Sequence, residues 1–275
     1  KPMKKKFAAG TLAVALSAAT LLGTTVSAEE TLASKEDYIV VFKTQNSLPA
    51  GYENVLAKAG GEVTTKLAKL GAVEVASSNP NFLAQIKKSS DVLDLDVQRI
   101  IFPEAPALST EAATDSVGEN ADLYNSLQWD IKQVTNDGAS WELPGGTGKS
   151  VDGKDIVVAV VDTGIDYNHP DLKENYAYGK SFVPGYPDAM DENSHGTHVA
   201  GAIAANGRTM GVGPDLKVAA YRVFGPTGGA TTASIADALK TAADDNVDVV
   251  NMSLSGYDWL QDPEQETADI AADMR

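Results

Sequence analysis

An almost unbroken apolar stretch that ends in Asp162 limits what this chain can fold into. Residues 156–161 read Ile-Val-Val-Ala-Val-Val. Since successive side chains of a strand point to opposite faces, such a strand is buried on both sides, as in a parallel sheet covered by helices. Periodic segments alternate after it: a helix over 195–205, a strand over 216–224, a helix over 231–244 capped by Thr231 or Thr232, a buried strand over 247–253 and a helix from 264. We therefore predict an α/β domain with a mostly parallel sheet and a site at the carboxyl ends of its strands.

The part of the chain before this domain has a different pattern. Segments with strand and helix character follow one another over 38–42, 50–59, 62–69, 72–76, 79–88 and 92–97. Their order, β-α-β-β-α-β, predicts a small α+β module of the ferredoxin-like kind. Residues 105–126 are rich in Ala, Ser, Thr and Glu with little periodicity, which predicts a linker and processing region.

The first 28 residues have the parts of a secretory signal peptide. Lys4, Lys5 and Lys6 precede an apolar stretch over 7–22 and then small residues up to Ala28. The apolar stretch is shorter than the roughly 20 residues that cross a bilayer, which argues against a retained anchor. We predict a secreted, extracellular protein with no membrane attachment after maturation. Its regions are a signal peptide over 1–28, the α+β module over 29–104, the linker over 105–126 and the α/β domain over 127–275.

Charge and residue usage exclude several classes of function. The chain has no cysteine, so it forms no disulfide framework, thiolate metal site or cysteine nucleophile. Its net charge is −16, and residues 111–275 hold 10 basic against 27 acidic residues, which argues against a nucleic-acid partner. Histidine occurs only at positions 169, 195 and 198, so imidazole chemistry is confined to one short window.

Asp162 and His195 stand where an acid–base pair can form. Asp162 ends the buried strand just before Gly164, and His195 opens the helix predicted over 195–205. A carboxylate bonded to one imidazole nitrogen fixes the tautomer and stabilises the imidazolium that forms when the other nitrogen takes a proton. The pair is two thirds of a nucleophilic triad. Taken alone, each residue also fits a structural role, as a turn cap or a hydrogen-bonded buried histidine.

Residues 145–150, Gly-Gly-Thr-Gly-Lys-Ser, look like the end of a phosphate-binding loop. That motif needs a glycine where position 143 is leucine, and it needs a strand before it, whereas here the strand follows. We therefore predict a glycine-rich turn and no nucleotide site.

Two segments together point to one family. Val-Val-Asp162-Thr-Gly-Ile-Asp and Asn-Ser-His195-Gly-Thr-His-Val-Ala-Gly resemble the Asp and His signatures of the subtilisin-like serine proteases, the subtilases. The resemblance extends over residues 125–275 and implies an incomplete subtilisin-like α/β domain. It implies that Asp162 orients the base, that His195 is the general base, and that His198 is a packing residue. It implies no cofactor for catalysis.

The resemblance also implies how a peptide binds. Two segments are similar to the strands that hold an extended substrate by backbone hydrogen bonds: Gly228, Gly229 and Ala230 in the first, and Ser253, Leu254 and Ser255 in the second. Ser255 stands where the family usually has glycine, which narrows the pocket next to the scissile bond. The module over 29–104 resembles the inhibitor-type propeptide of subtilases. The implied partners are therefore a peptide or protein substrate and the chain's own propeptide, cut off within the linker.

The sequence contains two candidate metal sites. Asp171 matches a calcium ligand of the family, so the resemblance implies a structural calcium ion, but the turn over 206–209 is shorter than the family's calcium loop. A turn carboxylate without an ion therefore stays an open alternative. A rival hypothesis is a metal-dependent hydrolase that uses His195, His198 and His169, although its spacing differs from the His-Glu-x-x-His of metalloproteases and provides no general base.

The third member of the triad is not found in the sequence. The subtilase nucleophile lies in a Gly-Thr-Ser-Met-Ala type segment, and the serines after residue 200, namely Ser234, Ser253 and Ser255, have no such context. We expect the N-terminal part of a secreted serine endopeptidase precursor, inactive as these 275 residues alone. A secreted pseudoprotease or binding protein with a dead subtilase domain is the alternative.

Two short segments bear on the substrate class. Residues 221–225 and 251–257 resemble those of lantibiotic leader peptidases, a subgroup that trims modified peptides. A broad extracellular endopeptidase is an equal alternative. The acidic domain favours basic residues near the scissile bond.

Overall fold

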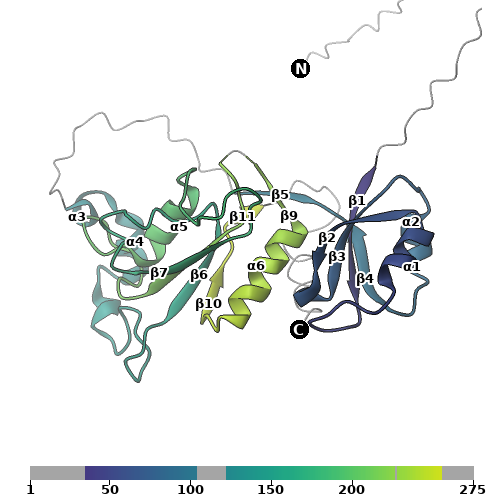
Figure 1. The fold of residues 1–275 in the computed structure, drawn as a ribbon. Coiled ribbons are helices and arrows are strands. Elements are labelled where there is room, and N and C mark those ends of the chain that lie inside the picture. Colours follow the sequence, from purple (N-terminus) through teal and green to yellow (C-terminus); the bar gives the residue numbers. More distant parts are fainter. Residues whose placement is uncertain (1–34, 104–121, 227, 256–275) are drawn as a thin grey trace, which may run out of the picture. The chain divides into compact units, whose positions relative to one another are not determined.

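The structure is a computed structural model that describes residues 35–103, 122–226 and 228–255 (Figure 1). The predicted signal peptide, most of the predicted linker and the helix expected from residue 264 lie outside the described residues. All described residues belong to one compact unit, Ser34–Arg275.

Residues 36–97 form the small α+β module expected from the sequence. Four strands build an antiparallel sheet in the order β2-β3-β1-β4. In central β1, Val40 stands opposite both Val73 and Leu95. The elements are β1 (Glu36–Phe42), α1 (Tyr52–Lys58), β2 (Gly61–Leu67), β3 (Ala72–Ser77), α2 (Phe82–Ile86) and β4 (Val92–Val97). Their order is the predicted β-α-β-β-α-β.

The two faces of β1 pack against different helices. Val40 belongs to a buried cluster with Leu56 of α1 and Phe82 of α2. Ile39 and Val41 point to the opposite face, where they cluster with Ala233 and Ala236 of α6 (Thr232–Asp244). The second face of the small sheet is therefore covered by a helix of the α/β domain.

The α/β domain is built on four parallel strands in the order β10-β6-β8-β7. They are β6 (Val157–Asp162), β7 (Tyr176–Ser181), β8 (Lys217–Arg222) and β10 (Val249–Asn251). Alternate residues of β6 face two helices: Ala159 clusters with Ala238 of α6, and Val160 clusters with Ala200 of α5 (His195–Ala204). The strand is buried on both faces, as its unbroken apolar sequence predicts, and Asp162 emerges at its carboxyl end.

The helices of this domain differ in length and capping. Helix α6 has 13 residues, and Thr231, one of the two predicted caps, accepts a hydrogen bond from the Ser234 N–H. Two short helices, α3 (Leu123–Leu127) and α4 (Trp129–Thr135), precede the sheet, so the last residues of the predicted linker are helical. None of the helices in the described ranges has the length and apolar character needed to cross a bilayer.

The expectation of a buried strand over 247–253 is wrong. Strand β10 has only three residues, and Val249 and Val250 are 51% and 38% exposed. Their exposure follows from topology, because β10 is an edge of the sheet that the described residues form. An apolar run indicates burial of a strand only where neighbours cover it on both sides.

Three short segments that are distant in the sequence form a third sheet in the order β11-β5-β9. They are β5 (Ile100–Pro103), β9 (Ala230–Thr231) and β11 (Leu254–Ser255). Strand β5 is antiparallel to both neighbours. The segment that follows the small module is therefore held between two strands of the α/β domain.

Candidate active site

Asp162 and His195 meet at the carboxyl end of β6. Nδ1 of His195 lies 2.7 Å from Oδ1 of Asp162; the Asp162 side chain is completely buried and the His195 side chain is 10% exposed. Oδ1 also accepts a hydrogen bond of 2.6 Å from the Thr163 N–H. Burial raises the pKa of Asp162 and outweighs the opposing effect of these two hydrogen bonds. The two residues are thus arranged as an orienting carboxylate and a base require.

Two glycines allow this close approach. A Cβ atom at Gly196 would lie 2.1 Å from the carbonyl oxygen of Gly164 and 3.1 Å from Oδ1 of Asp162. Gly164 itself has a φ of +110°, and a Cβ there would lie 2.5 Å from the carbonyl oxygen of Ala189. Only glycine fits both positions without displacing the backbone around Asp162.

Asp191, a residue that the sequence did not single out, links the segment after Asp162 to the start of the helix that carries His195. Its Oδ1 accepts hydrogen bonds from the Thr163 hydroxyl at 2.9 Å and from the Asn193 and Ser194 N–H groups at 2.9 and 3.0 Å. Its Oδ2 accepts the Thr197 N–H at 2.9 Å and the Thr197 hydroxyl at 2.6 Å. Burial alone would raise the pKa of Asp191, but these hydrogen bonds hold it below its ordinary value. The signal in the sequence was an aspartate four residues before His195.

Arg222 supports the segment that contains Asp191. This arginine ends β8 and is 2% exposed. Its Nη1 donates to the Met190 carbonyl at 2.7 Å, and its Nη2 donates to Oε2 of Glu192 at 2.6 Å. The guanidinium carbon also lies 5.1 Å from the centre of the Tyr186 ring. A planar donor group therefore holds the backbone carbonyl before Asp191 and the side chain of the residue after it.

The residues predicted to bind substrate lie mostly against β5. Ala230 stands opposite Ile101 in one pairing, and Leu254 and Ser255 stand opposite Pro103 and Phe102 in the other. Gly229 is also close, since a Cβ there would lie 2.7 Å from the Ile101 carbonyl oxygen.

The other two predicted residues have different surroundings. A Cβ atom at Gly228 would meet nothing within 4 Å. The Ser253 hydroxyl accepts a hydrogen bond of 3.0 Å from the Asn251 side-chain amide. The structure therefore groups four of the six predicted residues around one extended segment.

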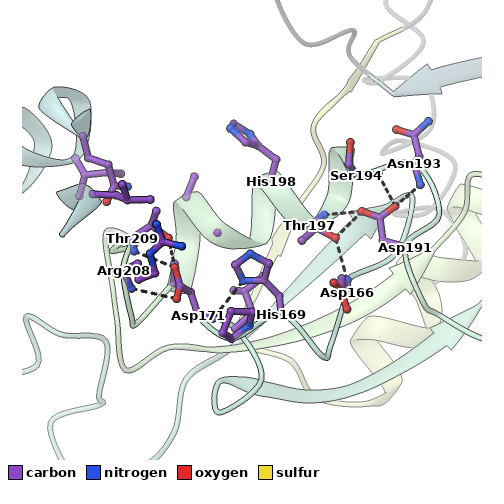
Figure 2. A pocket seen from close by; sticks show the side chains of 18 of the residues that line it. Asp166, His169, Asp171, Asp191, Asn193, Ser194, Thr197, His198, Arg208 and Thr209 are labelled. Atoms are coloured by element: carbon purple, nitrogen blue, oxygen red, sulfur yellow. Dashed lines mark hydrogen bonds between the residues drawn. The ribbon is translucent and has the colours of Figure 1, made fainter. Parts of the chain in front are cut away.

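A cavity of about 760 Å³ lies beside α5, and both His169 and His198 line it (Figure 2). His198 is exposed, so the expectation that it is a packing residue is wrong. The two histidines of α5 therefore have different environments. His195 is hydrogen-bonded to Asp162, whereas His198 lies on the outer face of the helix. In the described part of the chain, no group of three or more His, Asp or Glu side chains is placed to hold a metal ion.

Asp171, the expected calcium ligand, is 7% exposed. Its carboxylate accepts hydrogen bonds from the Arg208 N–H at 3.1 Å, the Thr209 N–H at 2.9 Å and the Thr209 hydroxyl at 2.8 Å. Calcium is bound by about six to eight oxygen ligands, whereas hydrogen-bond donors surround this carboxylate. The residues around Asp171 do not fit a calcium ion.

The fold and the site define an α/β domain with a carboxylate–imidazole pair at the carboxyl edge of a parallel sheet. Residues 153–272 match the model of the subtilase family, Peptidase S8. The chain is 32% identical over 261 residues to an alkaline protease of Alkalihalobacillus alcalophilus, a match that covers 92% of this chain and 61% of that protein. Residues 153–272 are therefore homologous to the subtilase family.

Two further relatives are leader peptide-processing proteases. The nisin leader peptide-processing serine protease of Lactococcus lactis subsp. lactis is 38% identical over 156 residues, covering 52% of this chain and 22% of that protein. The crystal structure of the epidermin leader peptide processing serine protease from Staphylococcus aureus matches with a TM-score of 0.61 at 23% identity, over 88% of this chain and 58% of that one, and supports the fold. The chain spans between 16% and 61% of the length of the curated relatives it matches.

Proposed function

We propose that residues 1–275 belong to the precursor of a secreted serine endopeptidase, in which Asp162 and His195 act with a serine that lies outside these residues. The observation that carries this proposal is the 2.7 Å contact between Nδ1 of His195 and Oδ1 of the fully buried Asp162. The match of residues 153–272 to the subtilase family supports the same reaction class.

The proposed mechanism assigns each residue one task. Asp162 accepts the Nδ1–H of His195, which leaves Nε2 to take the proton of the serine hydroxyl as its oxygen attacks the substrate carbonyl carbon. His195 then donates this proton to the leaving amine, and the Asp162 carboxylate stabilises the imidazolium in between. Thr163 and Asp191 hold the carboxylate and the start of α5 in register through the hydrogen bonds described above.

The small module over residues 29–104 is proposed to be an inhibitory propeptide. Strand β5 supports this role, because it lies antiparallel between β9 and β11, as an extended peptide does in strand-addition recognition. Ile101 is completely buried and clusters with Phe224, Ala230 and Leu254. A chain segment that lies between β9 and β11 excludes a substrate from this position, so activity requires cleavage in the linker over 105–126 and release of the module.

Secretion and substrate are proposed on the sequence and the relatives. A signal peptide over residues 1–28 supports export, and one relative carries the name minor extracellular protease Vpr. Two relatives are named for processing nisin and epidermin leader peptides, which supports a leader peptide as the substrate. A general extracellular endopeptidase is the second candidate, supported by the alkaline protease match.

Labelling with a serine-directed fluorophosphonate tests the catalytic assignment. We expect no labelling of residues 1–275 and labelling of the protein encoded by the complete open reading frame. In that protein, His195→Ala slows labelling by several orders of magnitude, about 10⁴-fold or more. His198→Ala is the matched control on the same helix and leaves labelling unchanged. Labelling of residues 1–275, or labelling that does not depend on His195, would overturn the proposal.

A further inference from the structure

Hydrogen bonds connect Asp171 to the turn over residues 206–210, which follows α5. An isolated bridge between Asn206 and Met210 closes this turn, and the Gly207 N–H donates to the Thr209 carbonyl at 3.1 Å. The Asn206 N–H donates to the backbone carbonyl of Asp171 at 2.8 Å. Because α5 ends at Ala204, the turn begins two residues after the helix that carries His195.

Both carboxylate oxygens of Asp171 face donors of this turn (Figure 2). Oδ1 accepts the Arg208 N–H, and Oδ2 accepts the N–H and the hydroxyl of Thr209. Burial raises the pKa of Asp171, but these hydrogen bonds outweigh that effect and the pKa lies below its ordinary value. The positive ends of two backbone dipoles and one hydroxyl dipole thus point at the carboxylate, where they would repel a cation.

The turn also leaves no room for a coordination shell. A Cβ atom at Gly207 would lie 2.2 Å from Oδ1 of Asp171 and 2.7 Å from its carboxyl carbon. The turn backbone is therefore in direct contact with the carboxylate. Calcium needs six to eight oxygen atoms at about 2.3–2.6 Å, and its ligands would have to replace this contact.

Other polar groups of the turn have partners as well. The Arg208 carbonyl accepts the N–H groups of Leu123 at 2.9 Å and Tyr124 at 3.2 Å, at the start of α3. The Gln128 side chain accepts the Met210 N–H at 2.8 Å and donates to the Met210 carbonyl at 2.9 Å. Carbonyl oxygens of the kind that bind calcium are therefore already used to attach α3 and α4.

We propose that this clasp, formed by Asp171 and the turn over 206–210, takes the place of the calcium ion that the subtilase resemblance implies at Asp171. The clasp joins the segment after β6 to the end of α5 and to the residues before α4. It performs with hydrogen bonds what a bound ion performs through shared ligands, so the stability of the domain does not depend on calcium at this position.

Thermal unfolding of the 275-residue chain tests the proposal. We expect the same Tm in excess calcium chloride and in excess EDTA. Thr209→Val removes the hydroxyl donor while keeping the shape of the side chain, and lowers Tm by roughly 3 to 10 °C in both buffers. Thr209→Ser keeps the hydroxyl and is the matched control, with a loss less than half as large.

Two results would overturn the proposal. One is a rise of Tm in calcium that Asp171→Asn removes, because Asp171 would then be an ion ligand. The other is a Thr209→Val variant as stable as Thr209→Ser, because the hydroxyl would then have no part in the clasp. A calcium effect that persists in Asp171→Asn supports the proposal, since the ion then binds elsewhere. If Asp171→Asn does not fold, the Thr209 pair still decides.

Discussion

The hydroxyl of Thr163 donates a hydrogen bond of 2.9 Å to the carboxylate of Asp191 and accepts one of 2.8 Å from the Gly196 N–H. Thr163 directly follows Asp162, and Gly196 directly follows His195. One side chain therefore connects the two residues next to the proposed catalytic pair, and Asp191 holds that side chain in place. The spacing of Asp162 and His195 therefore depends on this neighbouring network as well as on their own contact.

Replacing Asp191 with asparagine should weaken this network. We expect Asp191→Asn to lose about 2 kcal/mol of unfolding free energy at neutral pH, because hydrogen bonds to a charged acceptor are replaced by fewer, neutral ones. The pKa of Asp191 is lowered in the folded chain, so its stabilisation is present above the ordinary pKa of 3.8 and is lost as the pH falls through the folded value. The difference from wild type should therefore shrink in acid.

Urea unfolding over a series of pH values measures this effect. Asp130→Asn is the control, since Asp130 is exposed, and it should change the unfolding free energy by less than about 0.5 kcal/mol. An Asp191→Asn variant with wild-type stability at neutral pH would contradict the role given to this network.

Replacing either of two glycines of α5 with alanine should have opposite effects on the unfolding free energy. Gly196→Ala places a methyl group against the Gly164 carbonyl and Asp162, and should cost about 2 kcal/mol of unfolding free energy. It should also abolish the low-field NMR signal of the proton between His195 and Asp162. At Gly201 a Cβ meets nothing within 4 Å, so Gly201→Ala should stabilise the helix by about 0.5 to 1 kcal/mol. Equal effects at both positions would contradict the close packing at Gly196.

Local pattern in the sequence was enough to predict that Asp162 and His195 can pair, and to predict the β-α-β-β-α-β order. The apolar run before Asp162 reports burial on both faces of one strand, and periodicity is a property of neighbouring residues. Asp191 was missed because its partners Thr163 and Thr197 come from separate segments, 28 and 6 residues away. Only the folded backbone brings them to one carboxylate.

Pairings between strands that are distant in the sequence could not be predicted either, because only the folded backbone brings them together. Strand β5 is four residues long, and its neighbour β11 lies about 150 positions further along the chain, so no local periodicity marks the pairing. Val250 shows that local sequence can also predict burial wrongly. Its apolar neighbours in the sequence predict burial, but its position in an edge strand leaves it 38% exposed. Position in a sheet is set by topology and not by the strand's own residues.

Two neighbouring isoleucines in β5 provide a matched test of how this strand packs between β9 and β11. Ile101 is completely buried, and Ile100 is 52% exposed. We expect Ile101→Ala to cost about 3 kcal/mol of unfolding free energy, because it leaves a cavity in the cluster with Ala230 and Leu254. Ile100→Ala should cost less than about 0.5 kcal/mol. Amide hydrogen exchange should report faster opening of β5 in Ile101→Ala only. Equal exchange in the two variants would contradict the proposed packing of β5 between β9 and β11.

Asp237 should make the stability of the fold depend on pH in the opposite direction from Asp191. This carboxyl group lies on the part of α6 that faces the small module, and it lines a cavity together with Lys66, Lys69 and Glu74. Burial raises the pKa of Asp237, and the charge of Lys69 opposes this only in part. The folded chain therefore binds the proton more tightly than the unfolded chain. Stability is complete below the ordinary pKa of 3.8 and falls as the pH rises through the folded value.

The substitution Asp237→Asn should remove the loss of stability that accompanies ionisation of this carboxyl group. We expect Asp237→Asn to be more stable than wild type at neutral pH and to match it in acid, as measured by urea unfolding at several pH values. Asp244→Asn is the control on the same helix, where the carboxylate is 46% exposed and paired with Lys240, and it should change stability by less than about 0.5 kcal/mol. A loss of stability in Asp237→Asn at neutral pH would mean that the ionised pair with Lys69 stabilises the fold, and that desolvation of Asp237 is the smaller effect.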